Sequence, residues 1–102
     1  MEIEEMKRQA FAMIEDYNKK NGLDHNKETV FPHLIEEVGE LARELNHGKL
    51  NWRKDYNKNN FEEELIDVLI QILILANDNN VNIGEVFERK IKSLRARFEL
   101  DG

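Results

Sequence analysis

An apolar run near the middle of the chain constrains the fold more than any other feature of the sequence. Ten of the twelve residues at 65–76 are apolar, and Asp67 and Gln71 are the two exceptions. A helix of this composition is apolar around nearly its whole circumference, so it has to be buried on most sides. A strand is the alternative for a run rich in Ile and Val. The length of the run and the lack of a partner strand elsewhere in the sequence favour the helix.

Periodic apolar residues predict two helices before this run. The first covers about residues 2–20 and ends where Gly22 follows Asn. The second starts near residues 29–31, because Pro32 is tolerated in a first turn, and it closes before Gly48. The polar, basic segment that follows is predicted to be a loop.

Two asparagines mark further helix starts. Asn60 with Glu63 three residues later forms an Asn version of the capping box, and Asn82 with Glu85 repeats it. The apolar helix is therefore predicted to begin at Asn60, and a fourth helix with a basic cluster follows Asn82.

Composition limits the classes of protein that fit. The 102 residues suit a single domain, 1–102, and 35% of them are charged, with a net charge of −6. This charge disfavours binding to a nucleic-acid polymer or an anionic membrane. The absence of cysteine excludes disulfides and thiolate chemistry and fits the cytoplasm. The charged start is unlike a signal peptide, and the apolar run is too short to span a membrane.

Four helices of this length leave the apolar helix incompletely covered. We therefore predict an all-α four-helix bundle completed by oligomerisation, as a homodimer or higher oligomer.

Two pairs of acids suggest a metal site. Glu37 and Glu40 are three residues apart on the second helix, and Glu64 and Asp67 are three apart on the apolar helix. Residues with this spacing share a helix face, so antiparallel packing would bring the two pairs together. Four converging carboxylates need a cation, and oxygen ligands favour Mg²⁺ or Mn²⁺. The alternative is that these acids are a solvated surface, which explains Asp67 least well because it lies within the apolar run.

These residues carry a resemblance to a known family. The segments EEVGELARE at 36–44, EEELIDVL at 62–69 and ERKIKSLRARF at 88–98 resemble the MazG-like nucleoside triphosphate pyrophosphohydrolases, in the order that family has them. The resemblance implies a MazG-like bundle that forms a dimer or tetramer. It also implies hydrolysis of a nucleotide between its α and β phosphates, giving a monophosphate and pyrophosphate.

The resemblance also implies roles for the acids. The family's metal signature, Glu-x-x-Glu with Glu-x-x-Asp, falls on Glu37, Glu40, Glu64 and Asp67 as Mg²⁺ ligands. Either Glu37 or Glu40 is the candidate to accept a proton from the attacking water. Members commonly carry Lys and then Asn four residues later on the last helix, whereas here Leu94 stands in the place of that Asn.

Four other residues are candidates for substrate binding. Lys90 and Arg97 share a face of the last helix and suit a pyrophosphate group, although they also complement the helix dipole. Trp52 can either stack on a base or pack against the core. Asn77 can hydrogen-bond a sugar or base, or simply end its helix.

Other functions remain open at this point. The chain can instead be a catalytically silent helical oligomer, or an adaptor that binds a partner through the apolar helix. Related all-α enzymes act on dUTP or phosphoribosyl-ATP and share the acid pattern, so the nucleotide does not follow from it.

Overall fold

The structure is a computed structural model that describes residues 1–24, 27–50 and 58–100. It is all-α, as predicted, and its helices are α1 (Ile3–Lys20), α2 (Lys27–Leu50), α3 (Lys58–Asp78) and α4 (Ile83–Arg97). No helix in the described ranges combines the length and apolarity that crossing a membrane requires.

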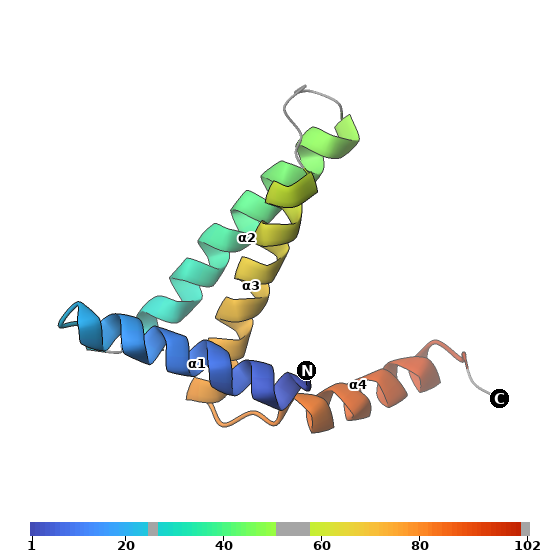
Figure 1. Cartoon of the computed structure of the whole chain (residues 1–102). Coiled ribbons are helices and arrows are strands. Elements are labelled where there is room, and N and C mark those ends of the chain that lie inside the picture. The colour runs from blue at the N-terminus through green and yellow to red at the C-terminus, as the bar shows by residue number, and fades with distance from the viewer. Residues whose placement is uncertain (25–26, 51–57, 101–102) are drawn as a thin grey trace.

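The helices α2 and α3 lie side by side and run antiparallel, and α1 crosses them near the start of α2 and the end of α3 (Figure 1). The core sits where α1 meets this pair. Ala10, Val30, Leu73 and Ile74 are buried there, and Ile74 is only 1% exposed. The fourth helix leads away from the other three (Figure 1). The chain by itself is therefore an open arrangement of helices, not the closed bundle.

The apolar helix is covered on part of its circumference. Val68, Leu73 and Ile74 are buried against the neighbouring helices, whereas Leu65 and Ile66 are 46% and 49% exposed. The expectation of burial on most sides is thus met within the chain for some positions and not for others.

Three helices end in the same hydrogen-bonded motif. After α1, Gly22 has a φ of +66°, and the Leu23 N–H donates to the Asn18 carbonyl over 2.7 Å. This pattern defines a Schellman end, and the predicted stop is confirmed. Asn80 and Glu99 occupy the equivalent left-handed positions after α3 and α4. Asparagine tolerates that conformation, whereas nothing in the sequence marks Glu99 for it.

The predicted start of α4 is confirmed. The Asn82 side chain accepts a hydrogen bond from the Glu85 N–H over 3.0 Å, which satisfies one of the free donors at the helix N-terminus.

The other predicted boundaries need correction. Helix α3 begins at Lys58, so Asn60 is not its cap and its first turn contains no acid. Helix α2 begins at Lys27, so Pro32 lies inside it beyond the first turn, and the helix continues past Gly48. Proline near a helix start removes a single hydrogen bond, and glycine weakens a helix by about 1 kcal/mol without ending it.

Candidate metal centre

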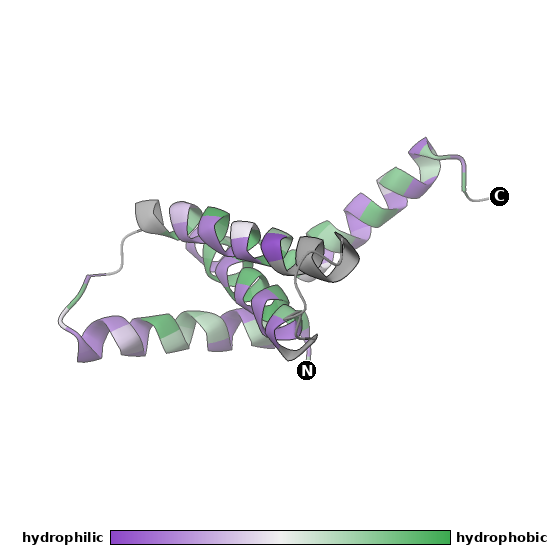
Figure 2. Ribbon diagram, turned by 90° about the horizontal axis from the view of Figure 1, so that it is seen from above, coloured by the Kyte–Doolittle hydropathy of each residue, from purple (hydrophilic) through white to green (hydrophobic). Residues whose placement is uncertain are grey.

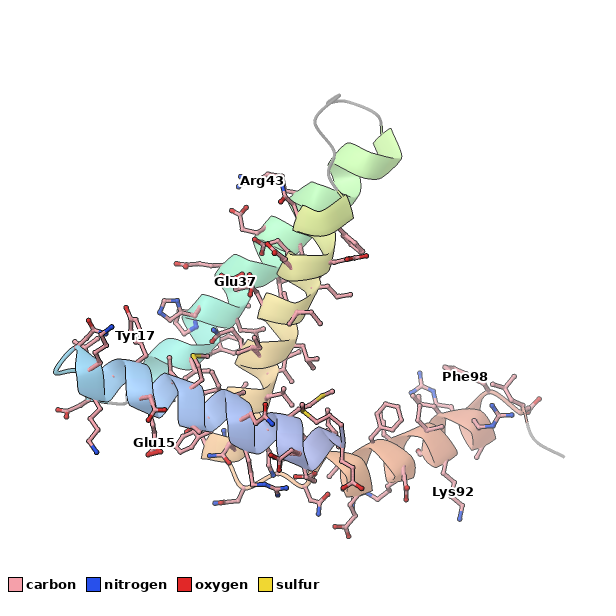
Figure 3. The ribbon with its side chains drawn as sticks, viewed as in Figure 1. Glu15, Tyr17, Glu37, Arg43, Lys92 and Phe98 are labelled. Carbon is pink, nitrogen blue, oxygen red and sulfur yellow. The ribbon has the colours of Figure 1, made fainter. Side chains whose placement is uncertain are left out.

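Three carboxylates from two helices meet in the seam between α2 and α3. Glu37 comes from α2, and Glu64 and Asp67 come from α3. One oxygen of each lies within 4.8 Å of the others. Figure 3 shows Glu37 where α2 lies beside α3. We call these three residues the acidic cluster.

Local sequence explains why Glu37 faces α3. Leu34 and Leu41 are half-buried on the same side of α2, three residues before Glu37 and four after it. Their packing against α3 turns this face of α2 inwards and carries the carboxylate with it. On α3, Glu64 lies one turn before the buried Val68, which brings it to the same seam. Hydrophobic packing therefore positions the acids.

The acidic cluster is electrostatically strained. Burial, a hydrogen bond shared with Glu37 and the negative charges of Glu37, Asp67 and Glu40 raise the pKa of Glu64 to about 7. Desolvation is the largest of these causes, because a shielded carboxylate loses the water that stabilises its charged form. Glu64 therefore keeps a proton well above the usual range for a glutamate unless a cation neutralises the site.

The donor set fits a divalent cation. Oε2 of Glu64 is shielded from solvent and has no hydrogen-bond partner among the residues that the structure describes. A buried polar atom left unpaired is costly, and a bound cation would satisfy it. Three carboxylates without a nitrogen or sulfur ligand are the donors that Mg²⁺ and Mn²⁺ favour.

Glu40 is placed differently from its three predicted partners. Its Oε1 lies 3.1 Å from a guanidinium nitrogen of Arg43, and it is outside the acidic cluster. It still acts on the cluster at longer range, since its charge contributes to the raised pKa of Glu64. Arg43 was not singled out from the sequence, although an acid and a base three residues apart on a helix are an identifiable pair.

The predicted substrate-binding residues that the structure describes are not brought to the cluster within one chain. Asn77 lies ten residues beyond Asp67 on α3, about 15 Å along the helix axis. Lys90 and Arg97 lie on α4, whose main contact is with α1. Figure 3 shows the neighbouring Lys92 and Phe98 well apart from Glu37. Trp52 lies outside the described residues.

The fold and the site define an all-α protein with an acidic cluster suited to a divalent cation. Residues 25–99 match the family model described as the MazG nucleotide pyrophosphohydrolase domain. The chain belongs to this family, so the resemblance seen in the sequence is confirmed.

One curated relative is similar to this chain. It is the uncharacterised protein YpjD of Bacillus subtilis (strain 168), which is 36% identical over 66 residues. The alignment covers 63% of this chain and 60% of the relative.

Proposed function

We propose that this protein is a Mg²⁺-dependent nucleotide pyrophosphohydrolase that cleaves the bond between the α and β phosphates of a nucleoside or deoxynucleoside triphosphate. The products are a nucleoside monophosphate and pyrophosphate. The observation that carries the proposal is the convergence of Glu37, Glu64 and Asp67 within the residues that match the family model.

In this proposal the acidic cluster holds Mg²⁺, or Mn²⁺ in its place, with Glu40 as a further ligand from the next turn of α2. The bound cation supplies charge neutralisation of the phosphates and a more acidic water. Glu37 and Glu40 are the candidates to accept the proton of the attacking water. Glu37 already shares a hydrogen bond with Glu64, which places it suitably for moving a proton.

The charge of the chain supports a role for a cation. A protein with a net charge of −6 repels a triphosphate unless cations or local basic groups intervene. Lys90 and Arg97 are proposed as such groups, and Trp52 and Asn77 as contacts to the base or sugar. Since α4 leads away from the cluster in its own chain (Figure 1), Lys90 and Arg97 can serve only a site formed with another copy. A homodimer or homotetramer is therefore part of the proposal.

The test is release of pyrophosphate from a panel of canonical nucleotides, dUTP and phosphoribosyl-ATP, with and without Mg²⁺. We expect Mg²⁺-dependent release that Asp67→Asn lowers at least about a hundredfold, as the loss of a group that aligns charge at a reacting centre does. Glu63→Gln is the matched control, because it removes an exposed acid of the same helix outside the cluster.

Three results would contradict the proposal. They are turnover without a divalent cation, release of orthophosphate instead of pyrophosphate, and the absence of turnover by folded protein on every nucleotide tested. Equal loss of activity in Glu63→Gln and Asp67→Asn would contradict the assignment of the cluster.

A further inference from the structure

The fourth helix exposes an apolar surface that its own chain does not cover. We call this surface the α4 stripe, and it consists of Val86, Phe87, Ile91, Leu94 and Phe98. None of the residues of α4 is buried, and Phe87 and Phe98 are 62% and 56% exposed. Figure 2 shows hydrophobic residues recurring along this helix as it leads away from the others. A helix of 15 residues is marginal in water without tertiary packing, so the stripe needs a partner.

A matching surface lies in a groove between α1 and α3, beside the core. The α1–α3 groove has a volume of about 330 Å³. Its lining is mainly apolar and includes Met6, Met13, Ile66, Leu69, Ile70 and Leu73. Met13 and Ile66 are 48% and 49% exposed. Methionine side chains adapt their shape readily, which suits an apolar helix as the occupant.

The groove is not accessible to the stripe of the same chain. The start of α4 is tied to α1 because the Gly84 N–H donates to Glu4 over 3.2 Å. Lys7 donates to the Val81 carbonyl over 2.9 Å and pairs with Glu4 over 2.7 Å. These bonds hold α4 in its outward direction (Figure 1), so folding back would have to break them.

Charge favours a second copy as the occupant. Helix α4 carries five basic and two acidic side chains, although the chain as a whole is acidic. Lys90 and Arg97 lie on one side of the α4 stripe, between Val86 and Leu94 around the helix. The exposed acid Glu62 precedes the groove residue Ile66 by one turn of α3. Opposite charges beside an apolar contact guide the correct pairing of two surfaces.

The exposed area is large enough for such an interface. The chain exposes 8213 Å², whereas a compact monomer of 12.1 kDa exposes about 6,000 Å². Its radius of gyration of 16.8 Å also exceeds the roughly 13 Å of a compact domain of this length. A stable interface buries about 800 Å² on each partner. The excess area of one chain therefore exceeds what a dimer needs.

We propose that the α4 stripe of one copy docks into the α1–α3 groove of a second copy, and that the second copy returns the same contact. A two-fold arrangement satisfies both copies with one kind of interface. This inference rests on the self-association in the proposed function and goes beyond it by assigning the surfaces. It does not depend on catalysis.

The test uses the absence of cysteine in the natural chain. A chain carrying Met13→Cys in the groove is mixed with a chain carrying Ile91→Cys in the stripe, and a short bismaleimide is added. We expect a crosslinked heterodimer. The matched control uses Lys92→Cys in place of Ile91→Cys. Lys92 is the next residue in the sequence but lies on the face of α4 opposite the α4 stripe, so this mixture should give little crosslinked product.

A second measurement follows the oligomeric state by analytical ultracentrifugation. Phe87→Asp should weaken dimerisation at least about thirtyfold, as the loss of a central interface residue does. Because Phe87 is exposed and lies outside the core, this variant should keep a cooperative thermal unfolding transition by circular dichroism.

The inference is overturned if the wild-type chain is a monomer, or if Phe87→Asp dimerises as well as the wild type. It is also overturned if the mixture of Met13→Cys and Ile91→Cys chains gives no more crosslinked product than the Lys92→Cys control. If the wild type is a dimer and Phe87→Asp does not weaken it, the docking inference fails but the proposed activity is not contradicted. Failure of the inference can therefore be distinguished from failure of the proposed function.

Discussion

Replacing Glu64 with glutamine tests the electrostatics of the acidic cluster directly. The pKa of Glu64 rises from 4.5 to about 7 because its carboxylate is shielded and faces three other acids. At about 1.4 kcal/mol per pKa unit, ionising this group above pH 7 costs at most about 3.5 kcal/mol. Solvent screens part of this cost, so we expect Glu64→Gln to stabilise the metal-free protein by about 1 kcal/mol at pH 8. In a domain of this size that raises the Tm by about 4–8 °C.

The same substitution should remove the effect of Mg²⁺. A cation present at ten times its Kd stabilises the wild-type chain by about 1.4 kcal/mol, because it binds the folded state and not the unfolded one. Glu64→Gln deletes a ligand, so its Tm should no longer respond to Mg²⁺. Glu63→Gln, an exposed neighbour, should behave like the wild type in both respects.

Thermal unfolding followed by circular dichroism, with and without Mg²⁺, measures both effects. The reasoning is refuted if Glu64→Gln melts at or below the wild type in metal-free buffer, since the carboxylate would then carry no electrostatic cost. It is equally refuted if Glu64→Gln retains the full response to Mg²⁺, or if Glu63→Gln loses that response.

Three further predictions concern pH, the helix cap and the core. Without Mg²⁺, the proton on Glu64 stabilises the fold below pH 4.5, and this contribution is lost as pH rises through about 7. The Tm of the wild type should therefore fall between about pH 6 and about pH 8, whereas the Tm of Glu64→Gln should not. An equal fall of the Tm in both proteins would contradict this prediction. Asn82→Ala removes the cap of α4 and should lower the stability of this helix by about 1 kcal/mol. The expected sign is faster amide hydrogen exchange in residues 83–97, with exchange in α3 unchanged. Unchanged exchange in α4 would show that the cap contributes nothing. Ile74→Ala, at the most buried side chain of the core, should destabilise by roughly 3 kcal/mol in urea unfolding, and a loss below about 1 kcal/mol would place the core elsewhere.

The helical fold could be predicted because its signals are local. Apolar spacing indicates each helix, Gly22 marks a helix end through its positive φ, and Asn82 marks a start through its side-chain acceptor. The same reasoning was wrong where local preference is weak. Asn60 favours a cap position, but nothing prevents the preceding residues from joining the helix, and α3 begins at Lys58.

The acids of the candidate site could be named from the sequence, but their grouping could not. Spacing shows that Glu37 and Glu40 share a face of one helix, and the same holds for Glu64 and Asp67. It does not say which oxygens approach each other across the seam. Glu40 forms an ion pair with Arg43, and the other three acids make up the acidic cluster.

The sequence by itself determined the helical class, the family and the four acidic residues, because these depend on residue type and on spacing along one helix. Only the tertiary structure decided that three of the acids meet, that Glu64 holds its proton to about pH 7, and that α4 leads away from the core with its stripe exposed. Those properties depend on contacts, burial and charge between helices that are distant in the chain, and helical periodicity carries no information about them.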